Sequence, residues 1–312
     1  MTERTPDDYD SPWKEALEHY LPEFMAFYFP AAEAAIDWQP GHHFLDQELR
    51  QIVREAALGK QTVDKLVEVT RRDGEVGWVY IHIEVQSQRD PDFARRLFSY
   101  HSRIYQRYAR PVASLAVLAD TEANWRPQHF GYELFGCRLR LDFPVAKLLD
   151  WQDRIEALLA EDNVFAWVTA AHLLTQRTRD DAQARYAAKW RLIRLLYQRN
   201  WDRPRILELL VIIDWLLHLP APLAQRLRDD IERLEEETHM RYVTSFEREA
   251  EKRGQKQGQK QGEATILLSQ MEHKFGTVPN NLRNRIEQAD TQTLLDWSKR
   301  ILTAETPEEV VH

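Results

Sequence analysis

The spacing of apolar residues changes near residue 145, and this change constrains the fold more than any other feature of the chain. Before it, β-rich runs occupy 63–69, 78–86, 113–119 and 137–143. Beyond it, apolar residues recur at helical spacing through most of the remaining sequence. We therefore expect an α/β (mixed α+β) N-terminal core, in which helices flank a central sheet, and an all-α C-terminal half.

Two helices are predicted within the N-terminal core. The first begins at Ser11, a good N-cap, with Pro12 in the first helical position, and it ends before Pro30. The second begins near Asp90 and ends before Pro111. The predicted order is therefore helix, hairpin, helix, strand and strand.

The two β-rich runs before residue 90 are joined by a turn that contains Asp73-Gly74, which is typical of a β-hairpin. If the chain turns about Gly74, facing residues have numbers that add to 148. Asp64 then lies opposite Glu84, with Cβ atoms roughly 5 Å apart. Gln86 shares the face of Glu84, while the alternate apolar residues of its strand point into a core.

Two carboxylates this close repel each other, and like charges across strands destabilise a sheet. A divalent cation between Asp64 and Glu84 removes that repulsion, and Mg²⁺ prefers oxygen ligands and water. Such a metal polarises a phosphoryl oxygen and activates a bound water, which the amide of Gln86 can orient. The alternative is that these side chains are ordinary polar residues on the solvent-exposed side of the sheet.

The helix predicted after the hairpin carries a stripe of arginines. Its apolar residues form one face, and Arg96, Arg103, Arg107 and Arg110 fall within about 60° on another face, with Arg95 beside them. Arginine binds phosphate in a forked geometry. The stripe therefore predicts binding to DNA phosphates; the alternative is a solvated helix face neutralised by acidic neighbours.

Together these segments resemble a known family. Asp10, Trp13 and Lys14 of the first helix, the DKLVEV (64–69) and HIEVQSQ (82–88) strands and the RRLFSY (95–100) helix resemble the recombination-promoting nuclease/putative transposase (Rpn) family of the PD-(D/E)XK nuclease superfamily. The C-terminal KFGTVP and LLDWSKRIL segments are similar to a small domain of unknown function that often ends these proteins.

The resemblance implies a restriction-endonuclease-like core that hydrolyses DNA phosphodiester bonds in a transposase-like role and promotes recombination. It implies that Asp64 and Glu84 bind Mg²⁺ or Mn²⁺ together with the backbone carbonyl of Val85. It also gives Gln86 the catalytic position at which the superfamily usually has lysine, and the related family often carries glutamine there.

The resemblance leaves other possibilities open. Related nucleases often add an acid of the first helix to the metal site; Glu18 and Glu23 both flank the apolar arc of that helix, and either can equally be a solvated acid. Because Gln86 removes the usual cation, the second hypothesis is a catalytically weak or inactive module of the same fold that binds DNA or a protein partner. The third is an oligomerisation scaffold built on residues 225–312.

The sequence divides into four predicted segments. They are a nuclease-like core at 1–150, a helical extension at 151–224, a charged helix with a Gly/Gln/Lys linker at 225–262, and a small helical domain at 263–312. The charged helix has a sparse apolar seam, which allows a homo-oligomer through the C-terminal helices.

Composition excludes several classes of protein. The net charge of −8 excludes a generally basic protein that coats nucleic acid, although a local basic face remains allowed. The single cysteine, Cys137, excludes an internal disulfide framework and a multi-cysteine zinc site, and it fits a reducing compartment. Glu208 and Asp214 interrupt the most apolar stretch, and the acidic N-terminus is no secretory signal. We therefore expect a cytoplasmic protein with no membrane segment.

Overall fold

The computed structural model describes residues 10–45, 65–72, 78–86 and 89–238 and, with short gaps, 262–311. The chain forms two compact units, residues 1–238 and 239–312. The predicted boundary at residue 150 lies within the first unit, and the four-part division of the sequence stays a prediction. Asp64, the Gly74 turn and residues 254–261 of the GQKQGQKQG linker lie outside the described residues.

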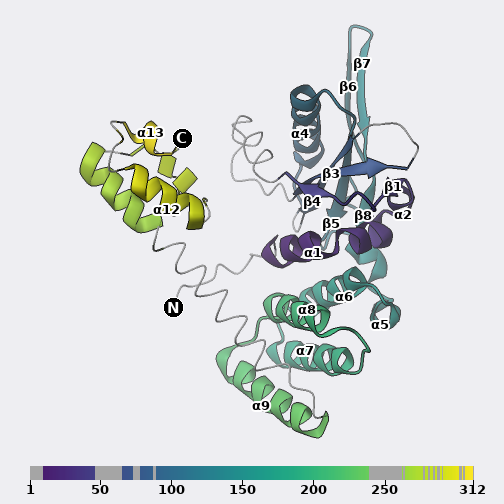
Figure 1. Cartoon of the computed structure of the whole chain (residues 1–312). Helices are drawn as coiled ribbons and strands as arrows, with labels where there is room; N and C mark the ends of the chain where they lie inside the picture. Colours follow the sequence, from purple (N-terminus) through teal and green to yellow (C-terminus); the bar gives the residue numbers. More distant parts are fainter. Residues whose placement is uncertain are drawn as a thin grey trace. The chain divides into compact units, whose positions relative to one another are not determined.

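A mixed sheet forms the centre of the first unit (Figure 1). Its strands follow the order β1-β3-β4-β5-β8, and β2 also pairs with β3. β3 and β4 are antiparallel, whereas β4, β5 and β8 run parallel. The strands are β1 (Ile36–Asp37), β2 (His43–Phe44), β3 (Lys65–Arg71), β4 (Trp78–Gln86), β5 (Val112–Leu118) and β8 (Val145–Lys147).

Helices cover the sheet on both sides, as predicted. In Figure 1, α4 (Phe93–Tyr108) lies above the sheet and α1 (Asp10–Tyr28) lies below it. The predicted apolar face of α4 is confirmed, since Phe93, Leu97, Tyr100 and Ile104 are all buried. Adjacent residues of β3 and β5 are buried in succession, which is the pattern of strands covered on both faces.

The first helix also follows the prediction, with a break inside it. Tyr20 has a non-helical backbone conformation, two residues before Pro22. A proline inside a helix removes one backbone hydrogen bond and crowds the preceding turn, so it explains the kink. α1 ends at Tyr28, and after Phe29 the four-residue helix α2 (Pro30–Glu33) begins.

The prediction that the chain is helical from Val145 onward was wrong at its start, and some short strands before it were not predicted. Val145–Lys147 forms strand β8, the edge of the sheet beside β5, and a short 3₁₀ helix (Leu148–Trp151) comes after it. A three-residue strand is hidden in sequence because its apolar residues also match the spacing of the helices after it. Three earlier strands were not predicted: the two-residue strands β1 and β2, and β6 (His129–Leu134), which pairs with the predicted strand β7 (Cys137–Asp142).

The rest of the first unit is helical, as expected. Asn163, Asp181 and Asp202 cap α6, α7 and α8 by accepting hydrogen bonds from backbone N–H groups of the first turn. The helices are α5 (Ile155–Ala160), α6 (Val164–Arg177), α7 (Ala182–Tyr197), α8 (Arg203–Leu216) and α9 (Ala221–Thr238).

The apolar seam of helix α9 is buried within the first unit. Leu227 and Ile231 are buried, and Glu235 accepts a 2.8 Å hydrogen bond from the Tyr197 hydroxyl of α7. Tyr186 of α7 donates another hydrogen bond to Asp230. In this structure the described part of the seam therefore packs against α7.

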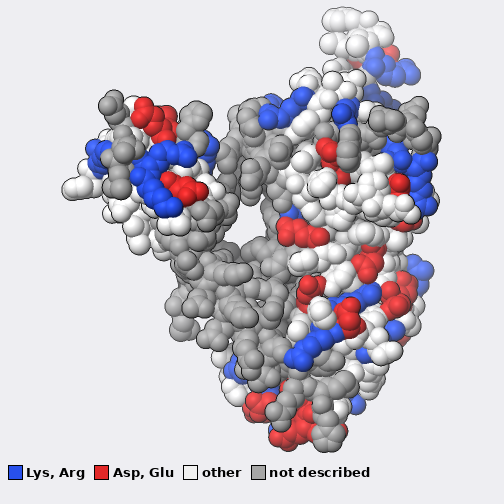
Figure 2. All heavy atoms as spheres, viewed as in Figure 1, with Lys and Arg blue, Asp and Glu red and all other residues white. Residues whose placement is uncertain are grey.

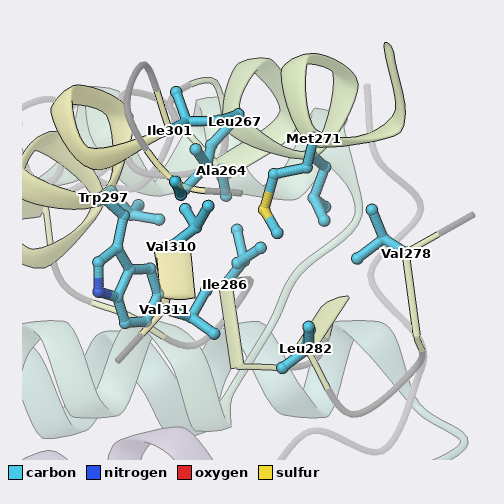
Figure 3. Close-up of a cluster of buried hydrophobic side chains, with 13 residues drawn as sticks. Ala264, Leu267, Met271, Val278, Leu282, Ile286, Trp297, Ile301, Val310 and Val311 are labelled. Carbon is cyan, nitrogen blue, oxygen red and sulfur yellow. The ribbon is translucent and has the colours of Figure 1, made fainter. Parts of the chain in front are cut away.

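The second unit has a small hydrophobic core of its own. Figure 3 shows apolar side chains that converge from the helical residues 264–275, from α12 (Thr291–Arg300) and from α13 (Pro307–Val310). Met271, Ile286 and Val310 have no exposed surface. In the part of the chain that the structure describes, no helix is long and apolar enough to cross a membrane.

The C-terminus of α4 contains a strained residue that predicts a stability effect. Ala109 has φ of 50°, the left-handed region, while its N–H donates to the Tyr105 carbonyl oxygen at 2.7 Å. Because glycine adopts this conformation without strain, Ala109→Gly should raise the free energy of unfolding by about 0.5–1 kcal/mol. Urea unfolding measures the change. Ala26→Gly, at an exposed position within α1, is the control and should lower the free energy of unfolding by a similar amount.

Candidate metal and nucleic-acid site

The hairpin pairing confirms the register expected from the sequence. Every described β3–β4 pair, from Lys65 opposite Ile83 to Thr70 opposite Trp78, has residue numbers that add to 148. This is the register that the prediction for Asp64 and Glu84 requires, and a shift of one residue would have placed the two on opposite faces. Asp64 itself, the residue before β3, lies outside the described residues.

The other candidate metal and catalytic residues lie at the C-terminal end of β4. Glu84, Val85 and Gln86 pair in parallel register with Ala116, Val117 and Leu118 of β5. β4 is an interior strand of the sheet, with β3 on one side and β5 on the other. The structure therefore places three candidate residues on one interior strand, at the end where the parallel strands β4 and β5 both terminate.

The two acids of the first helix have different partners. The Glu18 carboxylate accepts a 2.5 Å hydrogen bond from Lys65, whose side chain is almost fully buried and which is next to Asp64 in the chain. Glu23 instead forms a 3.3 Å ion pair with Arg205 of α8. Burial raises the pKa of Glu23, while Arg205 opposes that rise. Of the two, Glu18 is thus the one held next to β3.

Helix α4 is anchored to the sheet close to the candidate strand. The Nδ1 atom of His101 lies 3.0 Å from the Ser114 hydroxyl of β5, and Ser114 pairs with His82 of β4. Burial lowers the pKa of His101, so its ring is neutral at neutral pH. The arginine helix therefore packs over the strands that neighbour Glu84 and Gln86.

The arginines of α4 have different environments. Arg96 has a side chain only 11 % exposed and forms an ion pair with Asp90, and its guanidinium lies 5.6 Å from the centre of the Phe93 ring. Arg95 is exposed and donates to Asp92 at 3.1 Å. The predicted phosphate contact of Arg96 thus competes with an internal partner.

Arg103 and Arg107 occupy the next two turns of the helix. Arg103 is half-buried and has no ion-pair partner among the described residues. Arg107 is exposed, with its guanidinium 5.9 Å from the centre of the Tyr108 ring. The exposed Arg95, Arg107 and Arg110 are therefore the members of the stripe that solvent or a ligand reaches most easily, and the half-buried Arg103 comes next.

The structure shows one buried ion pair that the sequence pattern did not reveal. The Lys147 ammonium of β8 donates to both carboxylate oxygens of Asp120, at 2.9 and 2.8 Å, and to the Trp125 carbonyl oxygen at 3.0 Å. Both side chains are at most 2 % exposed. The available signal was an aspartate directly after a buried strand. The apolar spacing places Lys147 in a predicted helix, so it gives no sign of the ion pair with Asp120.

A second buried network joins the helices to the end of β5. The Trp13 indole donates to Nδ1 of His172 at 3.5 Å, while Nε2 of His172 lies 3.2 Å from the Ala119 carbonyl oxygen. Burial lowers the pKa of His172 to about 4, and the Ala119 hydrogen bond partly offsets this. A neutral, fully enclosed histidine of this kind joins α1, α6 and β5 and is not open to a substrate.

Within the described part of the chain, no group of three or more His, Cys, Asp or Glu side chains could hold a metal ion. Asp64 and the Glu84 side chain lie outside that part. A metal site at the hairpin therefore stays a prediction from the donor types and the register.

Comparison with protein families gives a match to part of the chain. Residues 33–115 match the model of the family described as "Putative transposase, YhgA-like". The matched span runs from the end of α2 through the hairpin and α4 into β5. It confirms the resemblance drawn from the EVQSQ and RRLFSY segments over that part of the chain. The comparisons with curated proteins and with solved structures found no match.

Proposed function

We propose, from the likeness of residues 33–115 to a transposase family, that this chain is a metal-dependent DNA endonuclease with a restriction-endonuclease-like core. The observation that supports it most is the β3–β4 register, which is the one that would align Asp64 with Glu84. The family match covers the same hairpin and the arginine helix after it. Recombination, which needs cut DNA strands, is the setting that this likeness favours.

In this proposal the hairpin binds one divalent cation. Asp64, Glu84 and the Val85 carbonyl supply oxygen atoms only, the donor type that Mg²⁺ and Mn²⁺ prefer. When bound, the cation supplies a Lewis acid for the phosphoryl oxygen and a water of lowered pKa. The Gln86 amide orients that water by hydrogen bonding and takes up no proton at neutral pH. The negative charges of Asp64 and Glu84 hold the cation at the hairpin.

The arginine helix binds the DNA backbone in the same proposal. Arg95, Arg103 and Arg107 bind phosphates, and Arg96 joins them where Asp90 releases it. We expect Arg103→Ala and Arg107→Ala each to weaken DNA binding and to reduce the slope of log K against log salt concentration by about one. Fluorescence anisotropy of a labelled duplex across a salt series measures both quantities.

Arg96→Ala is the matched comparison on the same helix. Because Arg96 is largely buried against Asp90, its removal should lower the melting temperature and leave the salt slope close to that of the wild type. If instead all three variants change the slope equally, the Arg96–Asp90 pair opens on binding. If none changes it, the helix does not bind phosphate.

A second candidate function is a catalytically weak or inactive module of the same fold that binds DNA or a protein partner. Gln86 in place of lysine favours it, because glutamine carries no charge with which to stabilise an anionic transition state. It predicts DNA binding without cleavage. A cytoplasmic location and a homo-oligomer through the C-terminal helices are compatible with both functions and belong to the proposal.

The experiment that distinguishes the two is cleavage of supercoiled plasmid by the purified chain with Mg²⁺, Mn²⁺, Ca²⁺ or EDTA. The nuclease proposal predicts nicking with Mg²⁺ or Mn²⁺, little with Ca²⁺ and none with EDTA. Folded protein that binds the plasmid but leaves it intact in every metal would favour the binding module. Nicking that persists in EDTA would contradict the metal site.

A further inference from the structure

The hairpin of β6 and β7 projects from the first unit. Figure 1 shows its two strands extending past α4 to a tip that no labelled helix or strand of the described residues of the same unit adjoins. The tip is a two-residue turn, Phe135-Gly136, in which both residues have positive φ (52° and 79°). This is the turn geometry that matches the twist of paired strands.

The two faces of this hairpin differ in character. Residues paired across an antiparallel ladder share a face, and successive pairs alternate between faces. One face is apolar along its whole length and carries Phe130 with Leu141, Tyr132 with Leu139, and Leu134 with Cys137. The other face is polar and carries His129 with Asp142, Gly131 with Arg140, and Glu133 with Arg138.

Among the described residues, packing partners are found at the base of the apolar face. The Phe130 ring stacks on Phe98 of α4, with centroids 4.9 Å apart and planes at 19°. Leu141 packs against the buried cluster that contains Phe93 and Phe143. The inner end of the apolar face is therefore continuous with the core between α4 and the sheet.

The outer end of the same face is exposed. Tyr132 is 53 % exposed and Leu134 58 %, and Phe135, in the turn directly beyond this face, is 99 % exposed. A bulky residue in the left-handed conformation is disfavoured, and a two-stranded hairpin alone is only marginally stable in water. A partner that covers the exposed tip of the hairpin therefore stabilises it.

The charges on the hairpin indicate what kind of partner fits. Arg138 forms an ion pair with Glu133 at 2.8 Å, and Arg140 with Asp142 at 2.8 Å, so the formal charges of residues 129–142 cancel. Figure 2 shows the acidic and basic side chains side by side below a mostly white tip. Neutralised arginines favour a protein surface over nucleic acid, whose binding depends on cationic contacts to phosphate. The chain as a whole carries −8, so a second copy is repelled least at such a neutral patch.

We propose that the apolar face of the β6–β7 hairpin docks against the same face of a second copy of this chain. A two-fold pairing of one self-complementary patch is the usual geometry of a homodimer. Each copy offers roughly 400 Å² of exposed apolar surface, since a fully exposed aromatic side chain presents about 150–250 Å². Two copies thus bury roughly 800 Å² from this face, which is small for a stable dimer and typical of a reversible one.

This dimer does not depend on the proposed nuclease activity. It also differs from an oligomer formed through the C-terminal helices, because the described seam of α9 is already packed against α7. The outer end of the hairpin face is instead left exposed by the described residues. The self-association surface is therefore placed at Tyr132, Leu134 and Phe135.

Sedimentation velocity of the full chain over about 1–200 µM tests the proposal. We expect reversible dimerisation. Leu134→Asp or Phe135→Asp should raise the dimer dissociation constant at least tenfold, because either change buries a charge at the interface. Glu133→Gln, on the polar face one residue away, is the matched control and should change this constant less than threefold. Exposed tip positions tolerate these changes, and circular dichroism with thermal melting verifies that each variant folds.

A second measurement uses the single cysteine as a reporter. Cys137 is exposed and lies on the apolar face near the tip, so a short bismaleimide should link two copies in the wild type. The linked yield should fall at least tenfold in Leu134→Asp. A chain that stays monomeric at 200 µM overturns the proposal, as does association that Leu134→Asp leaves unchanged. Weaker DNA binding by Phe135→Asp, without any change in self-association, would also overturn it and would assign the tip to nucleic acid.

Discussion

Lys147→Met should lower the free energy of unfolding by about 3–5 kcal/mol, the largest stability effect that we expect in this chain. Lys147 and Asp120 are almost completely buried, and the Lys147 ammonium makes three hydrogen bonds. Methionine has a similar shape but leaves the Asp120 carboxylate buried without its cation. Urea unfolding monitored by tryptophan fluorescence measures the loss, and Trp125 beside Lys147 reports on the site.

The exposed ion pair between Arg126 and Asp150 is the control. The Arg126 guanidinium nitrogen lies 2.5 Å from the Asp150 carboxylate oxygen, but both side chains are more than 40 % exposed. Arg126→Met should therefore lower the free energy of unfolding by only about 0–1 kcal/mol. The double variant Lys147→Met/Asp120→Leu should recover part of the loss, because no charge then remains buried. Equal costs for Lys147→Met and Arg126→Met would show that the buried pair opens to water.

Glu84→Gln should reduce Mg²⁺-dependent plasmid nicking by about 100-fold or more, which is the largest expected effect on activity. The change removes one of the two proposed carboxylate ligands and keeps the size of the side chain. Asp64→Asn should reduce nicking to a similar degree. Initial nicking rates with Mg²⁺ in excess measure both variants, and urea unfolding verifies that they remain folded.

The control for this prediction is Glu68→Gln. Glu68 is a carboxylate on β3, four residues after Asp64, and it pairs with Tyr80 in the same register. Its loss should change the nicking rate less than threefold, because it lies too far along the strand to share the proposed metal. A loss at Glu68 equal to that at Glu84 would show that nicking depends on the general charge of the hairpin.

The helices and strands that were predicted well are those in which the spacing of apolar residues agrees with the turn and cap residues beside them. The turn at Asp73-Gly74 and the apolar alternation indicated the strands of the hairpin and their register, which the described β3–β4 pairs confirm. The buried face of α4 agrees with its 3.6-residue spacing. The mixed α/β class and the helical C-terminal half agree with the change of spacing near residue 145.

The elements that were missed depend on contacts distant in sequence. β8 has three residues, and only its pairing with β5 and the partnership of Lys147 with Asp120 distinguish it from the start of a helix. The ion pair between Arg96 and Asp90 agrees with the alternative of a helix face neutralised by acidic neighbours, but helical projection alone does not show which arginine forms it. For the metal site, the residue pattern predicts donor types and register; whether a cation binds there depends on side-chain positions.

Mn²⁺ binding is the most direct test of whether Asp64 and Glu84 hold one divalent cation, the claim on which the nuclease proposal depends. Electron paramagnetic resonance of free Mn²⁺, titrated with the full chain, counts bound ions without requiring activity. We predict one site per chain in the wild type and in Glu68→Gln, and its loss in Asp64→Asn/Glu84→Gln. Equal Mn²⁺ binding by the wild type and the double variant, or no binding by the folded wild type, would contradict this metal site.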